Sequence, residues 1–166
     1  MESLESLALR LGKLCLARGL RLATAESCTG GWVAQALTEI PGSSQWFDAG
    51  YVTYSNDAKQ RMLGVPAETL RDFGAVSEET VEAMALGALR EGEANLSVAI
   101  SGIAGPDGGT ALKPVGTVWF AWAKKGQVLN TALCQFDGDR QSIREQAVRR
   151  ALLGLIQCAE HLEAGA

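Results

Sequence analysis

The chain has 166 residues, of which 47% are apolar and 20% are charged, and its formal net charge is −4. A chain of this length can bury a full core without disulfides or metals, and the acidic excess argues against a nucleic-acid surface. There is no run of about 18 apolar residues and no basic signal-peptide start, so neither a membrane span nor secretion is expected. We therefore expect one cytoplasmic domain over residues 1–166.

The first half of the sequence predicts alternating helices and strands. Leucines at helical spacing predict a helix over residues 3–18. A short buried strand in "GLRLATA", ending near Ala25, should follow, and then a helix over 29–40 closed by a proline and a glycine. "FDAGYVTY" has the composition of a strand. Ser55 is a suitable N-cap for a helix over 57–63, and "PAETLRDFG" predicts one more short helix.

The second half predicts a strand-rich region followed by a long helix. Ser77 should cap a helix in "EETVEAMALGALREG", and "LSVAISGIAG" predicts a strand that runs into the glycine-rich loop "GPDGGTALKPVG". The segments "TVWFAWAKK" and "VLNTALCQF" flank a turn at Gly126 and predict an antiparallel hairpin. A long helix should begin at Asp139. This order favours a mixed sheet with helices on both faces.

The turn "ESCTGG" places Ser27 and Cys28 where a strand ends and a helix begins. Side chains at such a junction reach the carboxyl edge of the sheet, beside outward-pointing N–H groups. Ser27 is therefore a candidate nucleophile, with the N–H groups of Cys28, Thr29 and Gly30 as an oxyanion hole. Two alternatives stay open. The turn could simply cap the helix, or Cys28 could be the nucleophile, its pKa lowered by the helix N-terminus.

A serine nucleophile needs a base, and His161 is the only histidine in the chain. His161 should lie near the end of the last helix, which argues against a Ser-His-Asp triad and a histidine-built metal site. The four scattered cysteines offer no zinc-binding spacing. In "YSNDAK", Tyr54 ends a strand and Lys59 lies on the next helix, at the same sheet edge as Ser27. A desolvated Lys59 can take the serine proton, and the alternative is an ordinary surface lysine.

Two further features suggest anion binding. The segment "SGIAGPDGG" is a strand that ends in a glycine-rich loop, where backbone N–H groups can approach a phosphate, although a plain connecting loop is an equal alternative. Arg140 lies near a helix N-terminus, a position unfavourable for a cation unless an anion or a nearby aspartate compensates it. The candidate substrate-binding residues are Ser101, Gly102, Gly105, Gly108 and Arg140.

Six motifs taken in order, "AESCTGG", "VTYSNDAK", "GAVSEETV", "SGIAGPDGG", "KPVGTVWFA" and "GDRQSIR", resemble the CinA C-terminal domain family. The resemblance runs from about residue 4 to residue 162, and within the family it is to the members that occur without a second domain. It implies an α/β fold: a three-layer αβα sandwich with a mixed, mostly parallel sheet and a C-terminal antiparallel hairpin. It also implies a homo-oligomer that uses no metal and no cofactor.

The activity implied by the resemblance is hydrolysis of nicotinamide mononucleotide to nicotinate mononucleotide and ammonia. Ser27 would then be the nucleophile, with Tyr54 and Lys59 beside it, and Arg140 would hold the phosphate. The expected partner is a small nucleotide rather than a nucleic acid or a membrane. The alternative is a nucleotide-binding module of the same family that has no catalytic activity.

Overall fold

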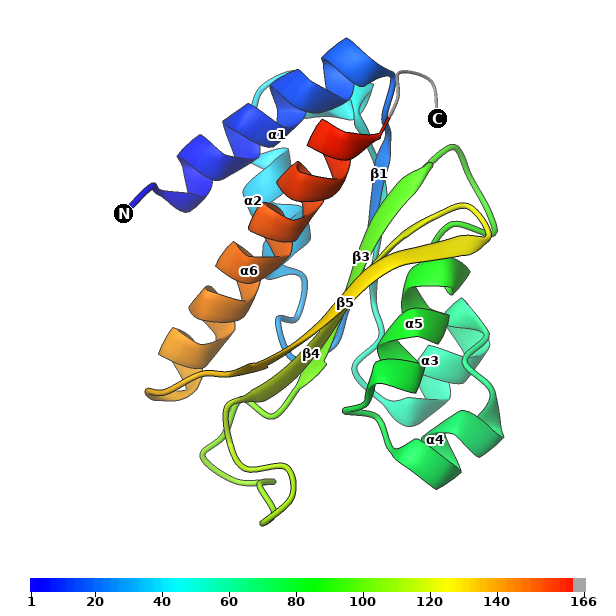
Figure 1. Cartoon of the computed structure of the whole chain (residues 1–166), viewed down its shortest axis with the longest axis vertical. Helices are drawn as coiled ribbons and strands as arrows, with labels where there is room; N and C mark the ends of the chain where they lie inside the picture. The colour runs from blue at the N-terminus through cyan, green and yellow to red at the C-terminus, as the bar shows by residue number, and fades with distance from the viewer. Residues whose placement is uncertain (163–166) are drawn as a thin grey trace.

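The structure is a computed structural model, and it describes residues 1–162. A five-stranded sheet stands between two layers of helices (Figure 1). The strands are β1 (Leu22–Glu26), β2 (Phe47–Val52), β3 (Leu96–Gly102), β4 (Thr117–Lys124) and β5 (Gln127–Gln135). The α-helices are α1 (Leu4–Arg18), α2 (Trp32–Thr38), α3 (Asn56–Leu63), α4 (Ala67–Phe73), α5 (Glu78–Gly87) and α6 (Arg140–His161), and a short 3-10 helix spans Ser43–Gln45.

The strand order is β2-β1-β3-β4-β5. β1 pairs in parallel with β2 and β3, whereas β4 is antiparallel to both β3 and β5. Four of the five described strands therefore run in one direction, and β4 alone runs against them. The predicted three-layer fold, mixed sheet and C-terminal hairpin are confirmed. Because β1, β2 and β3 are parallel neighbours, the loops that follow them leave the same edge of the sheet, where α/β proteins bind ligands.

The two faces of the sheet are packed differently. Helices α1, α2 and α6 cover one face and α3, α4 and α5 cover the other (Figure 1). Large side chains such as Leu11, Phe120 and Leu152 fill the first interface, and each buried leucine contributes about 1.5–3 kcal/mol. On the second face the strands supply mainly alanines: Ala23, Ala25, Ala99, Ala121 and Ala123. These short side chains let α5 pack close to the strands that carry the site.

The main difference from the predicted elements lies in the turn after β1. A helix was expected over residues 29–40, but α2 begins only at Trp32. Gly30 and Gly31 have φ angles of 61° and 100°, in the left-handed region, which cannot continue a right-handed helix. The caps predicted at Ser55 and Ser77 are confirmed, because each side chain accepts a hydrogen bond from a backbone N–H of its helix.

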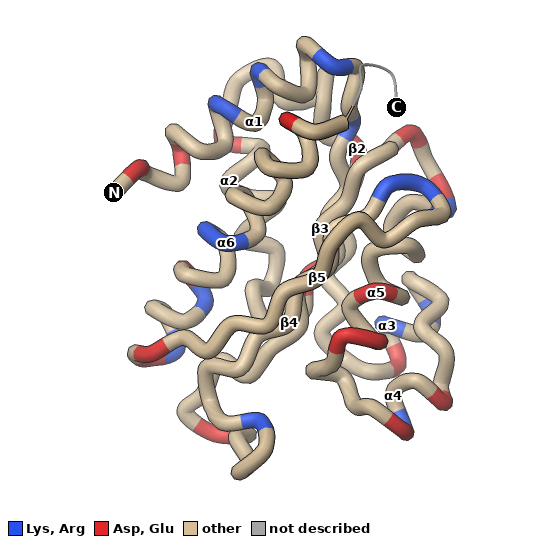
Figure 2. Tube along the Cα trace, viewed as in Figure 1, with Lys and Arg blue, Asp and Glu red and all other residues tan. Residues whose placement is uncertain are grey.

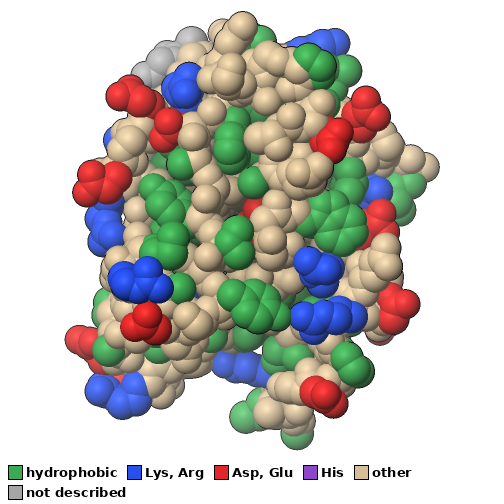
Figure 3. Space-filling view, turned by 180° about the vertical axis from the view of Figure 1, so that it is seen from behind, with side chains coloured by type: hydrophobic (Ala, Val, Ile, Leu, Met, Phe, Trp, Pro, Cys, Tyr) green, Lys and Arg blue, Asp and Glu red, His purple; other side chains and the backbone are tan. Residues whose placement is uncertain are grey.

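Charged residues of both signs are spread over the surface. Lys and Arg positions recur along the first half of α6, whereas acidic positions mark α5 (Figure 2). On the face seen in Figure 3, apolar side chains lie in small groups among polar and charged ones. Within residues 1–162, no helix combines the length and the apolar character that crossing a membrane requires.

Candidate active site

Ser27 is held at the carboxyl edge of the sheet by the backbone of its own turn. Its N–H donates to the carbonyl of Ile100 on β3 at 3.0 Å, and its carbonyl accepts from the Gly30 N–H at 3.0 Å. The left-handed glycines then direct the chain into α2. The Ser27 side chain lines a cavity of about 240 Å³ between the ends of β1 and β3 and the start of α6.

Lys59 enters this cavity from α3 and is buried, with only 1% of its surface exposed. Its Nζ lies 2.9 Å from Ser27 Oγ and donates to the carbonyl of Thr53 at 2.9 Å. Within residues 1–162 no carboxylate forms an ion pair with it. Burial therefore lowers the pKa of Lys59, because the desolvated ammonium is not compensated by an opposite charge. The alternative of a surface lysine is wrong.

Cys28 is also buried, and its side chain packs with the core cluster under α1, α2 and α6. Burial, together with the nearby carboxyl group of Glu26, raises the pKa of its thiol to about 12. The idea that the helix N-terminus lowers this pKa is therefore wrong, because loss of solvent around the thiolate outweighs the helix dipole. Of these two neighbours, only Ser27 is hydrogen-bonded to Lys59.

Tyr54 and Arg140 meet at the mouth of the cavity. The Tyr54 side chain is 61% exposed, and its hydroxyl accepts from Arg140 Nη2 at 3.0 Å. Arg140 Nη1 donates to the carbonyl of Gly105 at 2.5 Å. In the described part of the chain Arg140 forms no ion pair with Asp137 or Asp139, so the aspartate alternative is wrong. Tyr54 makes no hydrogen bond with Ser27 or Lys59. Ser27 and Lys59 are hydrogen-bonded to each other directly.

The structure brings most of the candidate residues together. Ser27, Cys28, Tyr54, Lys59, Ser101, Gly102 and Arg140 all border the cavity, as do Asn56, Ala75, Val76 and Ala104, which the sequence did not single out. Gly105 joins through its bond to Arg140. Gly108 does not line the cavity, because the loop projects beyond the sheet edge. The Gly30 N–H is already bonded to Ser27, and Thr29 is fully buried and does not line the cavity. The Cys28 N–H is therefore the remaining candidate oxyanion donor.

Glu26 is a functional candidate that the sequence reading missed. It is buried at the end of β1, and its carboxyl oxygens accept from the Thr29 hydroxyl and from the N–H groups of Val33 and Ala34 at 2.6–3.0 Å. Gly31, at the N-cap of α2, has no side chain to do this, so Glu26 at the end of β1 caps the helix in its place. The available signal was an acidic residue that closes the apolar strand "RLATA".

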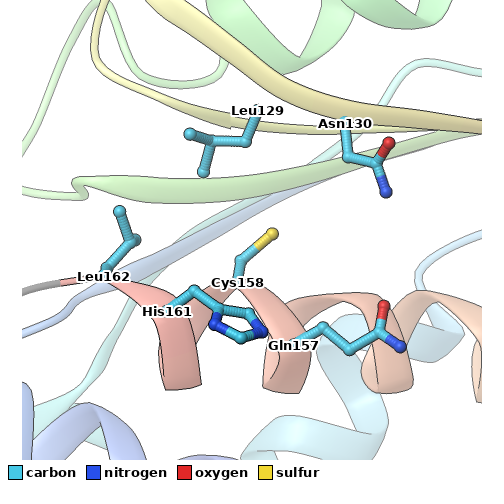
Figure 4. A pocket seen from close by; sticks show the side chains of 6 residues that line it. All are labelled: Leu129, Asn130, Gln157, Cys158, His161 and Leu162. Carbon is cyan, nitrogen blue, oxygen red and sulfur yellow. The ribbon is translucent and has the colours of Figure 1, made fainter.

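A second hollow, of about 400 Å³, lies between β5 and the end of α6 (Figure 4). His161 is exposed there on the last turn of α6, as expected. The lining also contains Cys158, whose thiol points towards β5, and Asn130 (Figure 4). Within residues 1–162 no three His, Cys, Asp or Glu side chains gather where they could hold a metal ion.

Comparisons with known proteins identify the family to which the chain is similar. The model of the CinA C-terminal domain matches residues 4–159. The nicotinamide-nucleotide amidohydrolase PncC of Pseudomonas putida is 53% identical over 95% of this chain and 98% of its own length. PncC of Escherichia coli K12 is 54% identical over 94% of each chain. The crystal structure of a competence-damaged protein (CinA) superfamily protein from Klebsiella pneumoniae has a TM-score of 0.92 at 43% identity, covering 97% of this chain and 100% of that one.

Proposed function

Because this chain belongs to the CinA C-terminal domain family, we propose that it is a nicotinamide-nucleotide amidohydrolase. Its substrate would be nicotinamide mononucleotide, its products nicotinate mononucleotide and ammonia, and its nucleophile Ser27. The names and near-complete coverage of the PncC relatives support the activity. The observation that carries the mechanism is the 2.9 Å contact between Lys59 Nζ and Ser27 Oγ inside a cavity.

The environment of Lys59 supports its role as the base. A neutral amine has two N–H groups and one lone pair. One N–H group donates to the Thr53 carbonyl, which orients the amine so that the lone pair can accept the proton of Ser27. Burial without an acidic partner lowers the pKa of Lys59, so that a larger fraction of the enzyme carries the neutral amine near neutral pH.

Acylation of Ser27 would proceed in two steps. Ser27 Oγ attacks the carboxamide carbon while its proton moves to Lys59 Nζ, and the Cys28 N–H stabilises the oxygen as it gains negative charge. The intermediate then collapses: the C–N bond breaks, Lys59 returns the proton to the departing nitrogen, and ammonia leaves. The result is an ester between Ser27 and the nicotinoyl group.

Deacylation would use the same groups in reverse order. Water attacks the ester carbon as Lys59 accepts one of its protons. The bond from carbon to Ser27 Oγ breaks, and Oγ regains a proton from Lys59. The product leaves as the carboxylic acid, which loses its remaining proton to solvent, and the enzyme returns to its starting state with one water consumed.

The phosphate of the substrate would bind at the mouth of the cavity. Arg140 supplies the guanidinium there, and it is already aimed at the rim by its bonds to Gly105 and Tyr54. A guanidinium can grip two phosphate oxygens at once. Binding energy from the phosphate would then position the amide against Ser27.

The direct test is ammonia release from purified protein incubated with nicotinamide mononucleotide. The intact chain should release ammonia and nicotinate mononucleotide in equal amounts, and the Ser27→Ala variant should release neither. A non-catalytic nucleotide-binding module would bind the nucleotide without releasing ammonia. The Ser27–Lys59 contact favours the enzyme, because binding alone requires no buried lysine beside a serine.

A further inference from the structure

The turn that carries Ser27 needs support from outside itself. Two of its residues, Gly30 and Gly31, adopt left-handed conformations, and Gly31 offers no side chain to cap α2. Glycine-rich turns are conformationally permissive, yet a nucleophile and its oxyanion donors must be held in a fixed geometry. Glu26 holds the α2 side of the turn through its three hydrogen bonds.

Arg144 holds the other side. It lies on α6 one turn beyond Arg140. Its Nε donates to the Cys28 carbonyl at 3.0 Å and its Nη2 donates to the Thr29 carbonyl at 3.2 Å. The guanidinium also lies over the ring of Trp32, 5.7 Å from its centroid. A side chain at Gly30 would bring a Cβ within 3.2 Å of Arg144 Nη2, so the glycine gives the guanidinium room to reach both carbonyls.

The two contacts of Arg144 fix the backbone of Cys28, the residue that follows the nucleophile and lines the cavity. The Thr29 N–H, on the far side of the peptide whose carbonyl Arg144 holds, belongs to a fully buried residue that does not line the cavity, so the Cys28 N–H is the candidate oxyanion donor. No other described residue accepts a hydrogen bond from the N–H of Cys28 or Thr29.

We infer that Arg144 is a positioning residue for the oxyanion hole: by holding the carbonyls of Cys28 and Thr29 it fixes the turn so that the Cys28 N–H stabilises the developing oxyanion. The inference rests on the proposed amidohydrolase function. It gives different roles to two arginines that lie one turn apart on α6. Arg140 faces the cavity mouth, and Arg144 acts through the backbone of the nucleophile turn. Arg144 itself does not touch the substrate in this account.

The test compares Arg144→Ala, Arg144→Lys and Arg150→Ala on nicotinamide mononucleotide, on its thioamide analogue and on nicotinamide riboside. Arg150 is a matched control, because it lies on the same helix and its guanidinium also covers a tryptophan ring, that of Trp122 at 4.8 Å, but it does not contact the turn. Sulfur accepts hydrogen bonds more weakly than oxygen, so the thioamide gains less from an oxyanion hole. The thermal midpoint of each variant monitors folding.

Arg144→Ala should lower kcat for the amide about 30- to 100-fold, somewhat less than complete removal of one oxyanion donor. KM should stay within about threefold, and kcat for the thioamide should fall less than about fivefold. Arg144→Lys, which keeps the charge but cannot reach both carbonyls, should fall between Arg144→Ala and the parent. It also provides the comparison if Arg144→Ala does not fold. Arg150→Ala should retain the parent kcat on the amide and the thioamide.

Three results would overturn the inference. Equal losses for the amide and the thioamide would mean that Arg144 only supports the fold, and an unchanged kcat would mean that the turn does not need it. A raised KM for the nucleotide but not for its riboside would make Arg144 a phosphate contact. Absence of ammonia release from the parent protein would instead reject the proposed function, and this inference with it.

Discussion

The cavity beside Ser27 and the hollow beside His161 lie at opposite ends of α6, roughly 30 Å apart at 1.5 Å per helical residue. By residue type, the second hollow looks more like a catalytic site, since it contains a histidine and a cysteine. However, His161 is exposed on the last turn of α6. Burial raises the pKa of the Cys158 thiol to about 11, which disfavours the reactive thiolate.

The cavity at the sheet edge contains a serine and a lysine, which are less reactive residue types than the histidine and cysteine of the second hollow, but their arrangement favours proton transfer. Its lysine is buried, hydrogen-bonded to a serine and without an acidic partner, so burial lowers the pKa of Lys59 and makes the amine a better base for Ser27. The same physical cause, loss of solvent, favours the protonated thiol of Cys158 and the neutral amine of Lys59, because it disfavours the charged form of each. The predictions below test whether the chemistry is confined to this cavity.

Substitution of the nucleophile should have the largest effect. Ser27→Ala should reduce ammonia release at least about 10⁴-fold, because no covalent intermediate can form. Cys28→Ala is the neighbouring control. Its side chain lies in the core, so it should lower the thermal midpoint while leaving kcat within a few-fold. If activity were lost in Cys28→Ala and kept in Ser27→Ala, the assignment of the nucleophile would be reversed.

Substitution of the base should come next. Lys59→Arg keeps the positive charge but cannot give up its proton, so kcat should fall about 10²- to 10⁴-fold, the usual contribution of a general base. In the parent, kcat/KM should rise with pH through a Lys59 pKa that lies below the ordinary value of about 10.4. Turnover by Lys59→Arg near the parent rate would rule out the lysine base.

Loss of the phosphate contact should have an intermediate effect. Arg140 is largely exposed at the rim, and such charges contribute less than buried ones. Arg140→Ala should lower kcat/KM for nicotinamide mononucleotide by roughly 10- to 50-fold, with little loss for nicotinamide riboside, which has no phosphate. Kinetic constants for both substrates provide the check. Equal losses on both would place the phosphate elsewhere.

Burial of Lys59 should also appear in the pH dependence of stability. The pKa of Lys59 is lowered in the folded state, so between that pKa and about 10.4 the unfolded chain binds more protons than the folded one. The free energy of unfolding therefore rises with pH in this window. Lys59→Met lacks this dependence, and its stability relative to the parent should decline as pH increases towards 10.4. Parallel stability curves would show that Lys59 is not buried as an unpaired amine.

The smallest effect should be in the second hollow. His161→Ala and Cys158→Ala should each leave kcat and KM within about twofold of the parent, because surface changes far from a site rarely alter it. Steady-state kinetics on the purified variants would measure this. A tenfold loss in either variant would show that the hollow takes part in the reaction.

The sequence predicted the parts of the site that follow from local patterns. Ser27, Lys59 and Arg140 were identified because each stands beside a predicted strand end or helix start, and the parallel strands bring those points together. The direction of the Cys28 side chain was not predictable, since it depends on the two left-handed glycines that follow. The contact of Arg144 with the turn joins residues about 115 positions apart, and no local pattern reveals such a pair.

The hydrogen bonds of Glu26 are a second example of contacts that local sequence patterns do not reveal. A glutamate after an apolar strand predicts a strand end, but its partners at Val33 and Ala34 depend on where α2 begins. That start was predicted too early, so the cap could not be recognised.

The expected homo-oligomer stays a prediction.

The most direct test of the central claim, that Ser27 activated by Lys59 is the nucleophile, is to map the covalent intermediate. Enzyme mixed with excess nicotinamide mononucleotide is quenched in acid within the first turnover, digested, and analysed by tandem mass spectrometry of the peptide that contains Ser27 and Cys28. The account predicts a substrate-derived acyl group on Ser27 Oγ in the parent, and none in Lys59→Arg. An acyl group on Cys28, or one on Ser27 that forms equally fast in Lys59→Arg, would contradict it.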